Sequence, residues 1–305
     1  MSPAPGMVLP DEAARELGAR GGVALATNEL GFTYPEGTEA LRGVSLEIGA
    51  GDLVAIVGQN GSGKSTLVRH FNGLLRATRG SVSVGGEPVD RQHVADLAAR
   101  VGIVFQNPDR QIFSSRVQAE VAFGARNAGL AGDDVEGRVH ACLRLVGLEE
   151  QARTNPYDLG YSRRKLLATA SVLAMGTPGL VLDEPTTGQD LRGVRLIRAL
   201  IDLLHEMGRT VIAISHDMRF VAEVFPRVIV MQGGRVVLDG PPETVFAEAS
   251  WPTLASTYLR PPLAATLGAR LGLGSTPTED RLIGALAQRP PGTSPGEDGS
   301  PPPGG

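Results

Sequence analysis

Several features that would define a protein class are missing from this chain of 305 residues. Cysteine occurs once, at Cys142, which excludes an intramolecular disulfide and argues against a cysteine-based zinc site. No apolar run approaches the roughly 18 residues of a spanning helix, and the N-terminus lacks the apolar region of a secretory signal. The formal net charge of −4 argues against nucleic-acid binding. We therefore expect a cytoplasmic protein that reaches a membrane only through a partner.

The two ends of the chain differ in composition from its centre. Residues 1–22 are rich in Pro, Gly and Ala and are expected to form a flexible leader, and residues 289–305 a disordered Pro/Gly tail. Between them, strand and helix patterns alternate, which predicts an α/β core with a mainly parallel sheet and an N-terminal antiparallel β subdomain. We expect the main domain at 23–248, with a helical subdomain inserted at about 109–175, and a C-terminal extension at 249–288.

The expected strands and helices follow from apolar spacing and from turn residues. Strands are expected at residues 24–34, 43–48, 53–57, 80–84, 101–105, 180–182 and 210–214, with a hairpin of 228–231 and 236–238. Helices are expected at residues 64–75, 191–207, 263–271 and 279–287.

A phosphate-binding pattern follows the strand at 53–57. The chain matches G-x-x-x-x-G-K-[ST] with the residues Gly58, Gln59, Asn60, Gly61, Ser62, Gly63, Lys64, Ser65 and Thr66. Glycines let backbone N–H groups turn toward phosphates, and the N-terminus of the next helix adds partial positive charge. Lys64 is suited to neutralise phosphate oxygens and Ser65 to ligate Mg²⁺. Only two of the 29 Lys and Arg residues are lysines, so one at this position argues against a chance match among 40 glycines.

Acidic residues and a histidine end two further apolar strands. Residues 179–182 lead into Asp183 and Glu184, and residues 210–214 lead into His216. Asp183 is suited to hold Mg²⁺, and Glu184 to polarise an attacking water as general base. His216 can contact the γ-phosphate and orient Glu184. Helix capping and core packing are the ordinary interpretations of such residues, and a shared sheet edge with the phosphate loop favours the catalytic one.

Two more residues complete the predicted site. Gln106 follows the strand at 101–105, where its amide can ligate Mg²⁺ or the water from a loop that moves. Tyr34 precedes the first hairpin and offers a ring that can stack on adenine, although a tyrosine there is often part of a core.

Taken in this order, the motifs resemble those of the ATP-binding-cassette (ABC) ATPases over about residues 24–245. The resemblance implies a P-loop NTPase fold in which two cassettes pair head to tail and bind ATP and Mg²⁺ between one Walker A loop and the partner's signature loop. It identifies Tyr34 as the A-loop tyrosine, residues 58–66 as Walker A, Gln106 as the Q-loop, Asp183 as the end of Walker B, Glu184 as the catalytic glutamate and His216 as the switch histidine.

A narrower resemblance is to the energy-coupling-factor (ECF) and cobalt-type import ATPases. It is carried by residues 105–113, Phe-Gln-Asn-Pro-Asp-Arg-Gln-Ile-Phe, and by 120–124, Glu-Val-Ala-Phe-Gly. The segment from 241 onward is similar to that subgroup's C-terminal extension. The resemblance implies an import complex for a vitamin or a transition-metal cation, with a transmembrane coupling protein and a substrate-capture membrane protein as partners. The chain is then expected at the cytoplasmic face of the membrane.

The signature loop departs from the family pattern Leu-Ser-Gly-Gly-Gln. In its place stand Leu159, Gly160, Tyr161, Ser162 and Arg163. Ser162 can replace the lost hydroxyl donor and Arg163 can pair with phosphate. The D-loop keeps Asp190 but has Gln189 where leucine is common. We expect a pair with a different cassette and unequal ATP sites; the alternative is a homodimer in which the variant signature still works.

Other functions stay open at this point. The ATPase of an importer that uses a soluble solute-binding protein differs only in the Q-loop neighbourhood and the C-terminal segment. A DNA-repair cassette requires a long coiled coil before the signature, which the 64–159 interval lacks. A ribosomal cassette requires two P-loops, and a nucleotide-binding regulator needs neither Glu184 nor His216.

Overall fold

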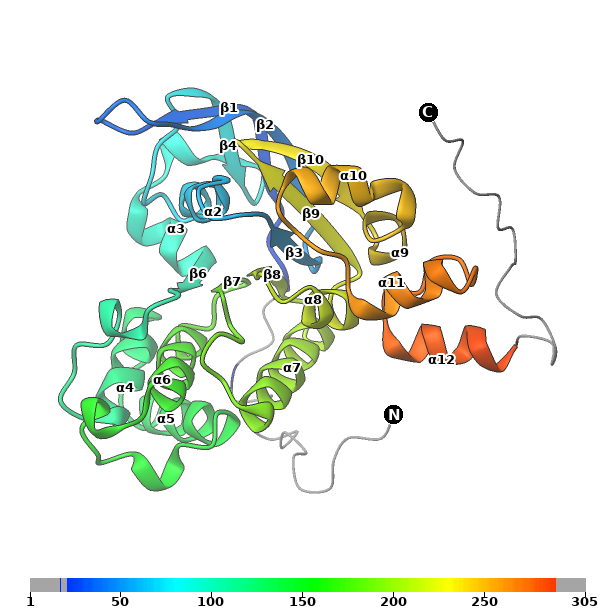
Figure 1. Ribbon diagram of the computed structural model, residues 1–305. Coiled ribbons are helices and arrows are strands. Elements are labelled where there is room, and N and C mark those ends of the chain that lie inside the picture. The colour runs from blue at the N-terminus through cyan, green and yellow to red at the C-terminus, as the bar shows by residue number, and fades with distance from the viewer. Residues whose placement is uncertain (1–16, 18–20, 289–305) are drawn as a thin grey trace, which may run out of the picture.

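The computed structural model describes Leu17 and residues 21–288, which form two sheets with helices packed against them (Figure 1). The strands are β1 (Leu25–Thr33), β2 (Glu39–Ile48), β3 (Leu53–Val57), β4 (Arg79–Val84), β5 (Glu87–Pro88), β6 (Val101–Val104), β7 (Gly179–Asp183), β8 (Thr210–Ile214), β9 (Arg227–Gln232) and β10 (Arg235–Gly240). The predicted tail at 289–305 and most of the predicted leader lie outside the described residues.

Helices connect these strands and extend beyond them. The α-helices are α2 (Lys64–Phe71), α3 (Val94–Arg100), α4 (Val117–Asn127), α5 (Asp133–Leu145), α6 (Tyr161–Ala174), α7 (Leu191–Glu206), α8 (Met218–Val224), α9 (Pro242–Val245), α10 (Trp251–Ser256), α11 (Leu263–Arg270) and α12 (Glu279–Ala287). Short 3₁₀ helices are η1 (Val89–Arg91), η2 (Pro108–Arg110), η3 (Glu149–Gln151), η4 (Pro156–Asp158) and η5 (Glu248–Ser250).

The two sheets have different topologies. The first is antiparallel, with the strand order β2-β1-β4-β5, and the second has the order β10-β9-β3-β8-β7-β6. In the second sheet β9, β3, β8, β7 and β6 pair in parallel, and β10 forms an antiparallel hairpin with β9. The predicted α/β fold with an antiparallel N-terminal sheet is confirmed.

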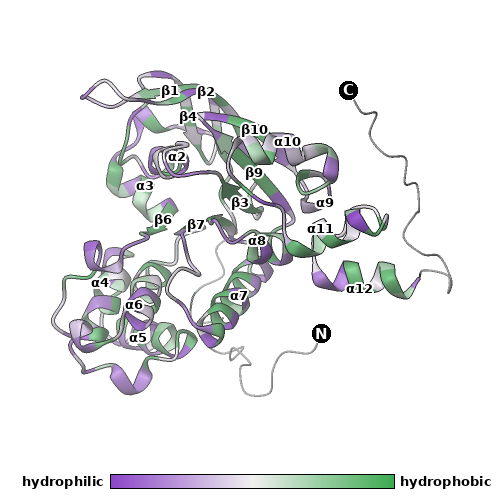
Figure 2. Ribbon diagram, in the orientation of Figure 1, coloured by the Kyte–Doolittle hydropathy of each residue, from purple (hydrophilic) through white to green (hydrophobic). Residues whose placement is uncertain are grey.

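Strand β3 lies between β9 and β8, and all five of its residues are buried. Val54 and Ile56 belong to the hydrophobic cluster formed with the antiparallel sheet and α2, whereas Ala55 and Val57 belong to the cluster formed with the helices on the opposite side. Both faces of a parallel sheet are covered in this way, which is why its strands are continuously apolar (Figure 2). The loop that follows β3 therefore begins at a buried, central strand, which fixes its position.

Helices α4, α5 and α6 form a lobe on the side of the parallel sheet away from the antiparallel one (Figure 1). Val135 and Leu143 are buried on α5, and the buried Val146 follows that helix. Gly124 lets α4 approach α6 closely, because a Cβ placed there would lie 2.1 Å from the carbonyl oxygen of Ser171.

Several boundaries of predicted elements differ from the structure; strand β2, for example, begins at Glu39 rather than at residue 43. Helix α2 ends at Phe71 rather than at residue 75, because Gly73 has a φ of 75° and turns the chain out of the helix. Leu17, in the predicted flexible leader, is buried, and its carbonyl oxygen accepts a hydrogen bond of 2.9 Å from Arg209 Nη2. At that residue the leader packs against the core.

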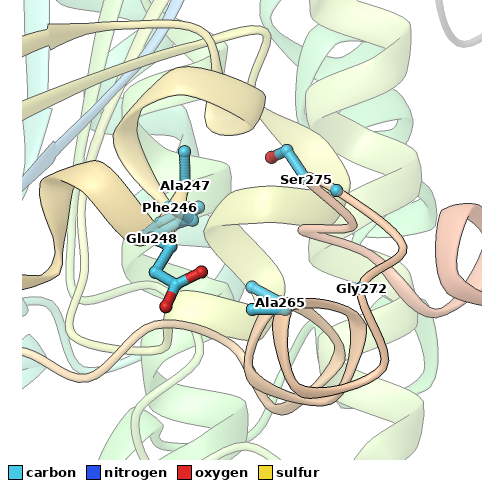
Figure 3. A pocket seen from close by; sticks show the side chains of 8 residues that line it. Phe246, Ala247, Glu248, Ala265, Gly272 and Ser275 are labelled. Carbon is cyan, nitrogen blue, oxygen red and sulfur yellow. The ribbon is translucent and has the colours of Figure 1, made fainter. Parts of the chain in front are cut away.

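The segment after β10 contains α11 and α12 at the predicted positions, together with α9 and α10, which are too short to show a periodic pattern. A cavity of about 320 Å³ lies between residues 246–248 and the region from α11 to Ser275 (Figure 3). None of its lining residues belongs to the predicted nucleotide site.

Replacing Gly124 by alanine tests the close contact between α4 and α6. The added Cβ must push the helices apart, so Gly124→Ala should lower the free energy of unfolding by about 1–3 kcal/mol. Gly137→Ala is the matched control, because Gly137 is exposed on α5 with nothing within 4 Å of the new Cβ. It should stabilise the protein by about 0.5–1 kcal/mol through helix propensity. Urea unfolding measures both, and equal effects would contradict the close packing.

Candidate functional site

The loop between β3 and α2 contains two glycines at which a side chain would not fit. Gly58 has a φ of 153°, and a Cβ there would lie 2.3 Å from the carbonyl oxygen of Met231. Gly63 has a φ of 101° at the N-cap of α2, and a Cβ there would lie 2.7 Å from the carbonyl oxygen of Ala40. The loop thus packs backbone against backbone, and the N-terminal amides of α2 stay uncapped by a side chain. Such amides favour an anion.

Lys64 lies across this loop. Its Nζ donates to the carbonyl oxygens of Gly58 at 2.7 Å and Gln59 at 2.9 Å. Burial lowers the pKa of Lys64, while the carboxylates of Glu184 and Asp183 act in the opposite direction. The two carbonyl oxygens thus hold the ammonium group across the loop. Phosphate oxygens could replace these carbonyl oxygens as acceptors of its N–H groups.

Ser65 and Asp183 bring a hydroxyl and a carboxylate together from α2 and the end of β7. Ser65 Oγ donates to Asp183 Oδ2 at 3.2 Å. Burial and the neighbouring Glu184 raise the pKa of Asp183, whereas the hydrogen bond from Ser65 lowers it. Hard oxygen ligands of this kind, beside a phosphate loop, fit Mg²⁺.

Glu184 and His216 meet because β7 and β8 are parallel and in register, with Asp183 opposite Ile214. His216 Nδ1 lies 2.7 Å from Glu184 Oε2; the His216 side chain is 66% exposed and that of Glu184 is 10% exposed. Glu184 has a φ of 53°, unusual for a residue with a side chain, and its N–H donates to the carbonyl oxygen of Ile214 at 2.8 Å. A carboxylate held in this way is placed to take a proton from water.

Of the two remaining predicted residues, Tyr34 lies beside the phosphate loop and Gln106 does not join the site. Tyr34 Oη and Thr66 Oγ1 are 3.0 Å apart, and the half-buried Tyr34 ring packs edge-on against Phe32, so this tyrosine borders the phosphate loop. Gln106 is exposed after β6, and among the described residues its side-chain amide has no hydrogen-bond partner. The structure therefore does not bring the Gln106 amide into contact with Ser65 or Asp183.

The predicted signature residues lie at the start of α6 and contact two other loops of the same chain. Tyr161 Oη donates to the carbonyl oxygen of Gln106 at 3.2 Å, and its ring lies against Gly188. Ser162 Oγ donates to Gln189 Oε1 at 2.6 Å, and Gln189 Nε2 donates back to the carbonyl oxygen of Ser162 at 3.2 Å. Two departures from the family pattern, Ser162 and Gln189, are thus hydrogen-bonded to each other.

The other signature and D-loop residues have separate positions. Leu159 is buried in the core, Gly160 is the N-cap of α6 and Arg163 is exposed. Asp190 caps α7, where its Oδ1 accepts from the N–H of Gly193 at 2.7 Å. Within residues 21–288, no hydrogen bond joins 159–163 to the loop at 58–66.

Sequence reasoning gave no role to one residue that lies beside the turn of Glu184. Lys165, on α6, is buried, and its Nζ donates to the carbonyl oxygens of Glu184 and Thr187. The sequence signal that could have identified Lys165 is the rarity of lysine, because Lys64 and Lys165 are the only lysines of the chain.

A pair of exposed aromatic rings lies beside the Gln106 loop. Phe113 is 62% exposed and Phe123 is 45% exposed, and their rings meet edge to face at 4.8 Å. Beneath them the buried carboxylate of Glu120 accepts from the N–H groups of Phe113 and Ser114 at 3.1 and 2.8 Å. The apolar surface is therefore rigidly supported.

Comparison with known proteins gives a consistent result. The ABC transporter family profile matches residues 41–187. The energy-coupling factor transporter ATP-binding protein EcfA of Methanocaldococcus jannaschii is 40% identical over 243 residues, 79% of this chain and 86% of that protein. A putative ABC transporter ATP-binding protein of Caldanaerobacter subterraneus is also 40% identical, over 83% of this chain, which spans only 44% of that relative's length.

A solved structure supports the same relationship. The cbiO1 protein of Clostridium perfringens, described as part of the ABC transporter complex cbiONQ, superposes with a TM-score of 0.68 and 37% identity, covering 81% of this chain and 95% of that one. Within the described part of this chain, no helix is long and apolar enough to cross a bilayer.

Proposed function

The chain belongs to the family of ABC transporter ATP-binding proteins, and from this premise we propose that it binds and hydrolyses ATP to energise an ECF-type import complex. The observation that carries the proposal is the convergence of Lys64, Asp183, Glu184 and His216 at the edge of the sheet where β3, β7 and β8 end. The cargo is proposed to be a vitamin or a transition-metal cation, as in the subgroup that the chain resembles.

The residues at this edge have distinct roles in the proposed reaction. The loop amides and Lys64 bind the β- and γ-phosphates, and Tyr34 stacks on the adenine. Ser65 and Asp183 hold Mg²⁺, with Gln106 joining them when its loop closes; the metal neutralises charge on the phosphate oxygens. Glu184 takes a proton from the attacking water, and His216 orients Glu184.

The proposed assembly pairs this chain with a different cassette. A signature loop has to present its helix N-terminus and a hydroxyl to ATP on the partner subunit. Here Ser162 already donates to Gln189, and the Tyr161 ring occupies the space over Gly188. The signature of this chain is thus engaged with its own D-loop, which favours a partner with an intact signature and leaves the Walker site of this chain as the main hydrolytic one.

The proposed membrane partner is a transmembrane coupling protein that docks on Phe113 and Phe123. The two rings are exposed, supported from below by Glu120, and lie in the loop and helix that follow Gln106. Movement at Gln106 is thereby passed to the docking surface. A substrate-capture membrane protein completes the complex, and the chain acts at the cytoplasmic face of the membrane.

Two substitutions separate nucleotide binding from hydrolysis. Lys64→Ala should weaken ATP binding roughly a hundredfold or more, because it removes charged donors from a buried phosphate site. Glu184→Gln should keep ATP affinity while lowering turnover at least roughly a hundredfold, because the amide cannot take a proton. A fluorescent ATP analogue measures affinity, and phosphate release measures turnover. Unchanged turnover in Glu184→Gln removes this residue from its role, and unchanged affinity in Lys64→Ala removes the phosphate loop from its role.

Restoring the signature tests the unequal-site proposal. The purified chain alone should hydrolyse ATP slowly, and the combined change Gly160→Ser, Tyr161→Gly, Ser162→Gly and Arg163→Gln should raise the rate about tenfold or more by returning donors worth about 1.5–3 kcal/mol. Arg163→Gln alone is the control, since no hydrogen bond joins Arg163 to Gln189 in the part of the chain that the structure describes. Full-speed hydrolysis by the unmodified chain as a homodimer contradicts the proposal.

The docking surface is tested by co-purification from membranes. The double variant Phe113→Ser, Phe123→Ser should lose the transmembrane partner and keep ATP affinity, because the rings lie on the surface away from the phosphate loop. Leu263→Ser is the matched control, since Leu263 is 73% exposed on α11. Wild-type recovery of the partner with the double variant shows that the coupling protein docks elsewhere.

A further inference from the structure

Lys165 contacts the backbone of the turn that carries Glu184. It occupies the fifth position of α6 and is 2% exposed. Its Nζ donates to the carbonyl oxygen of Glu184 and, at 3.1 Å, to that of Thr187. The two lysines of the chain therefore both end at backbone carbonyl groups around the same site, Lys64 at the phosphate loop and Lys165 at the turn that carries Glu184.

The turn at 184–187 needs such support. Glu184 adopts a φ of 53°, a left-handed conformation that costs a residue with a Cβ about 1 kcal/mol or more. The N–H of Thr187 donates to the carbonyl oxygen of Glu184 at 3.2 Å, and Lys165 supplies a second donor to the same oxygen. With the carbonyl group fixed by two donors, the direction of the Glu184 side chain toward His216 is fixed as well.

The chemistry of Lys165 fits this purpose better than a role in packing. A leucine or methionine fills a buried helix position without desolvating a charge. Burial lowers the pKa of Lys165 to about 8 from its ordinary value, although Glu184 and Asp183 raise it. The ammonium is thus buried at a cost in free energy, and the groups it hydrogen-bonds are two carbonyl oxygens of the catalytic turn.

We propose that Lys165 is a positioning residue for ATP hydrolysis, which holds the Glu184 turn in its left-handed conformation and links it to the signature helix α6. The inference rests on the proposed ATPase function. It assigns Lys165 no contact with ATP, so its loss should act on the rate of the chemical step and leave nucleotide affinity unchanged.

The test measures ATP affinity and single-turnover hydrolysis for the full-length chain, together with whatever partners co-purify with it. Lys165→Met should lower the hydrolysis rate about 10- to 100-fold, because a displacement of about 1 Å at the general base has an effect of this size. ATP affinity should change less than about threefold. Lys165→Arg, which keeps a charged donor, should recover most of the rate. Lys165→Leu, which also lacks a donor, gives the same answer if Lys165→Met does not fold.

The decisive comparison combines Lys165→Met with Glu184→Gln. If Lys165 acts through Glu184, Lys165→Met should slow the Glu184→Gln protein less than about threefold, because the group it positions is no longer a base. Thr169→Val is the packing control: Thr169 is buried on the same helix, and its Oγ1 donates to the carbonyl oxygen of Lys165 rather than to the turn at 184–187. It should alter thermal stability and leave the rate unchanged.

The outcomes separate the inference from the function on which it rests. If the wild-type protein hydrolyses ATP and depends on Glu184, but Lys165→Met retains the rate or lowers it equally in both backgrounds, the positioning role is wrong and the ATPase function stands. If the wild-type protein binds or hydrolyses no ATP, the proposed function is wrong and the inference with it.

Discussion

The parallel pairing of β3, β8 and β7 is the constraint on which the candidate site depends. Ile56 of β3 is opposite Ile214 of β8, and Ile214 is opposite Asp183 of β7. Because parallel strands end at the same edge, this register brings the glycine loop, the carboxylates and His216 together from three distant parts of the sequence. A slip of one residue would turn Asp183 to the other face of the sheet.

The same edge concentrates charges that are expensive to bury. Lys64 and Lys165 have lowered pKa values because of burial, and the pKa of Asp183 is raised for the same reason. Asp183 and Glu184 favour the charged form of each lysine, whereas Glu184 disfavours the charged form of Asp183. In the proposed reaction a triphosphate and a metal ion would replace the carbonyl partners of Lys64 and the hydrogen bond between Ser65 and Asp183.

The start of α6 connects the helical lobe to this edge. Tyr161 reaches the carbonyl oxygen of Gln106, Ser162 pairs with Gln189, and Lys165 holds the Glu184 turn. The loops that carry Gln106, Glu184 and Gln189 are therefore attached to one helix within a single chain. Two side chains of the variant signature, Tyr161 and Ser162, therefore bind loops of their own subunit. The proposed dependence on a second cassette follows from these contacts.

Sequence alone determined the identity of the phosphate loop, the acidic strand end and the α/β alternation, because each depends on neighbours within a few residues: glycines that set backbone shape, a lysine at a required spacing and apolar periodicity. Helix ends near Gly73 and the burial of Leu17 depended on packing. Tertiary structure alone decided that Lys165 meets Glu184 and that Ser162 meets Gln189, because these contacts join residues 19 and 27 positions apart. No local pattern encodes such a distance; the register of the strands and the approach of α6 set it.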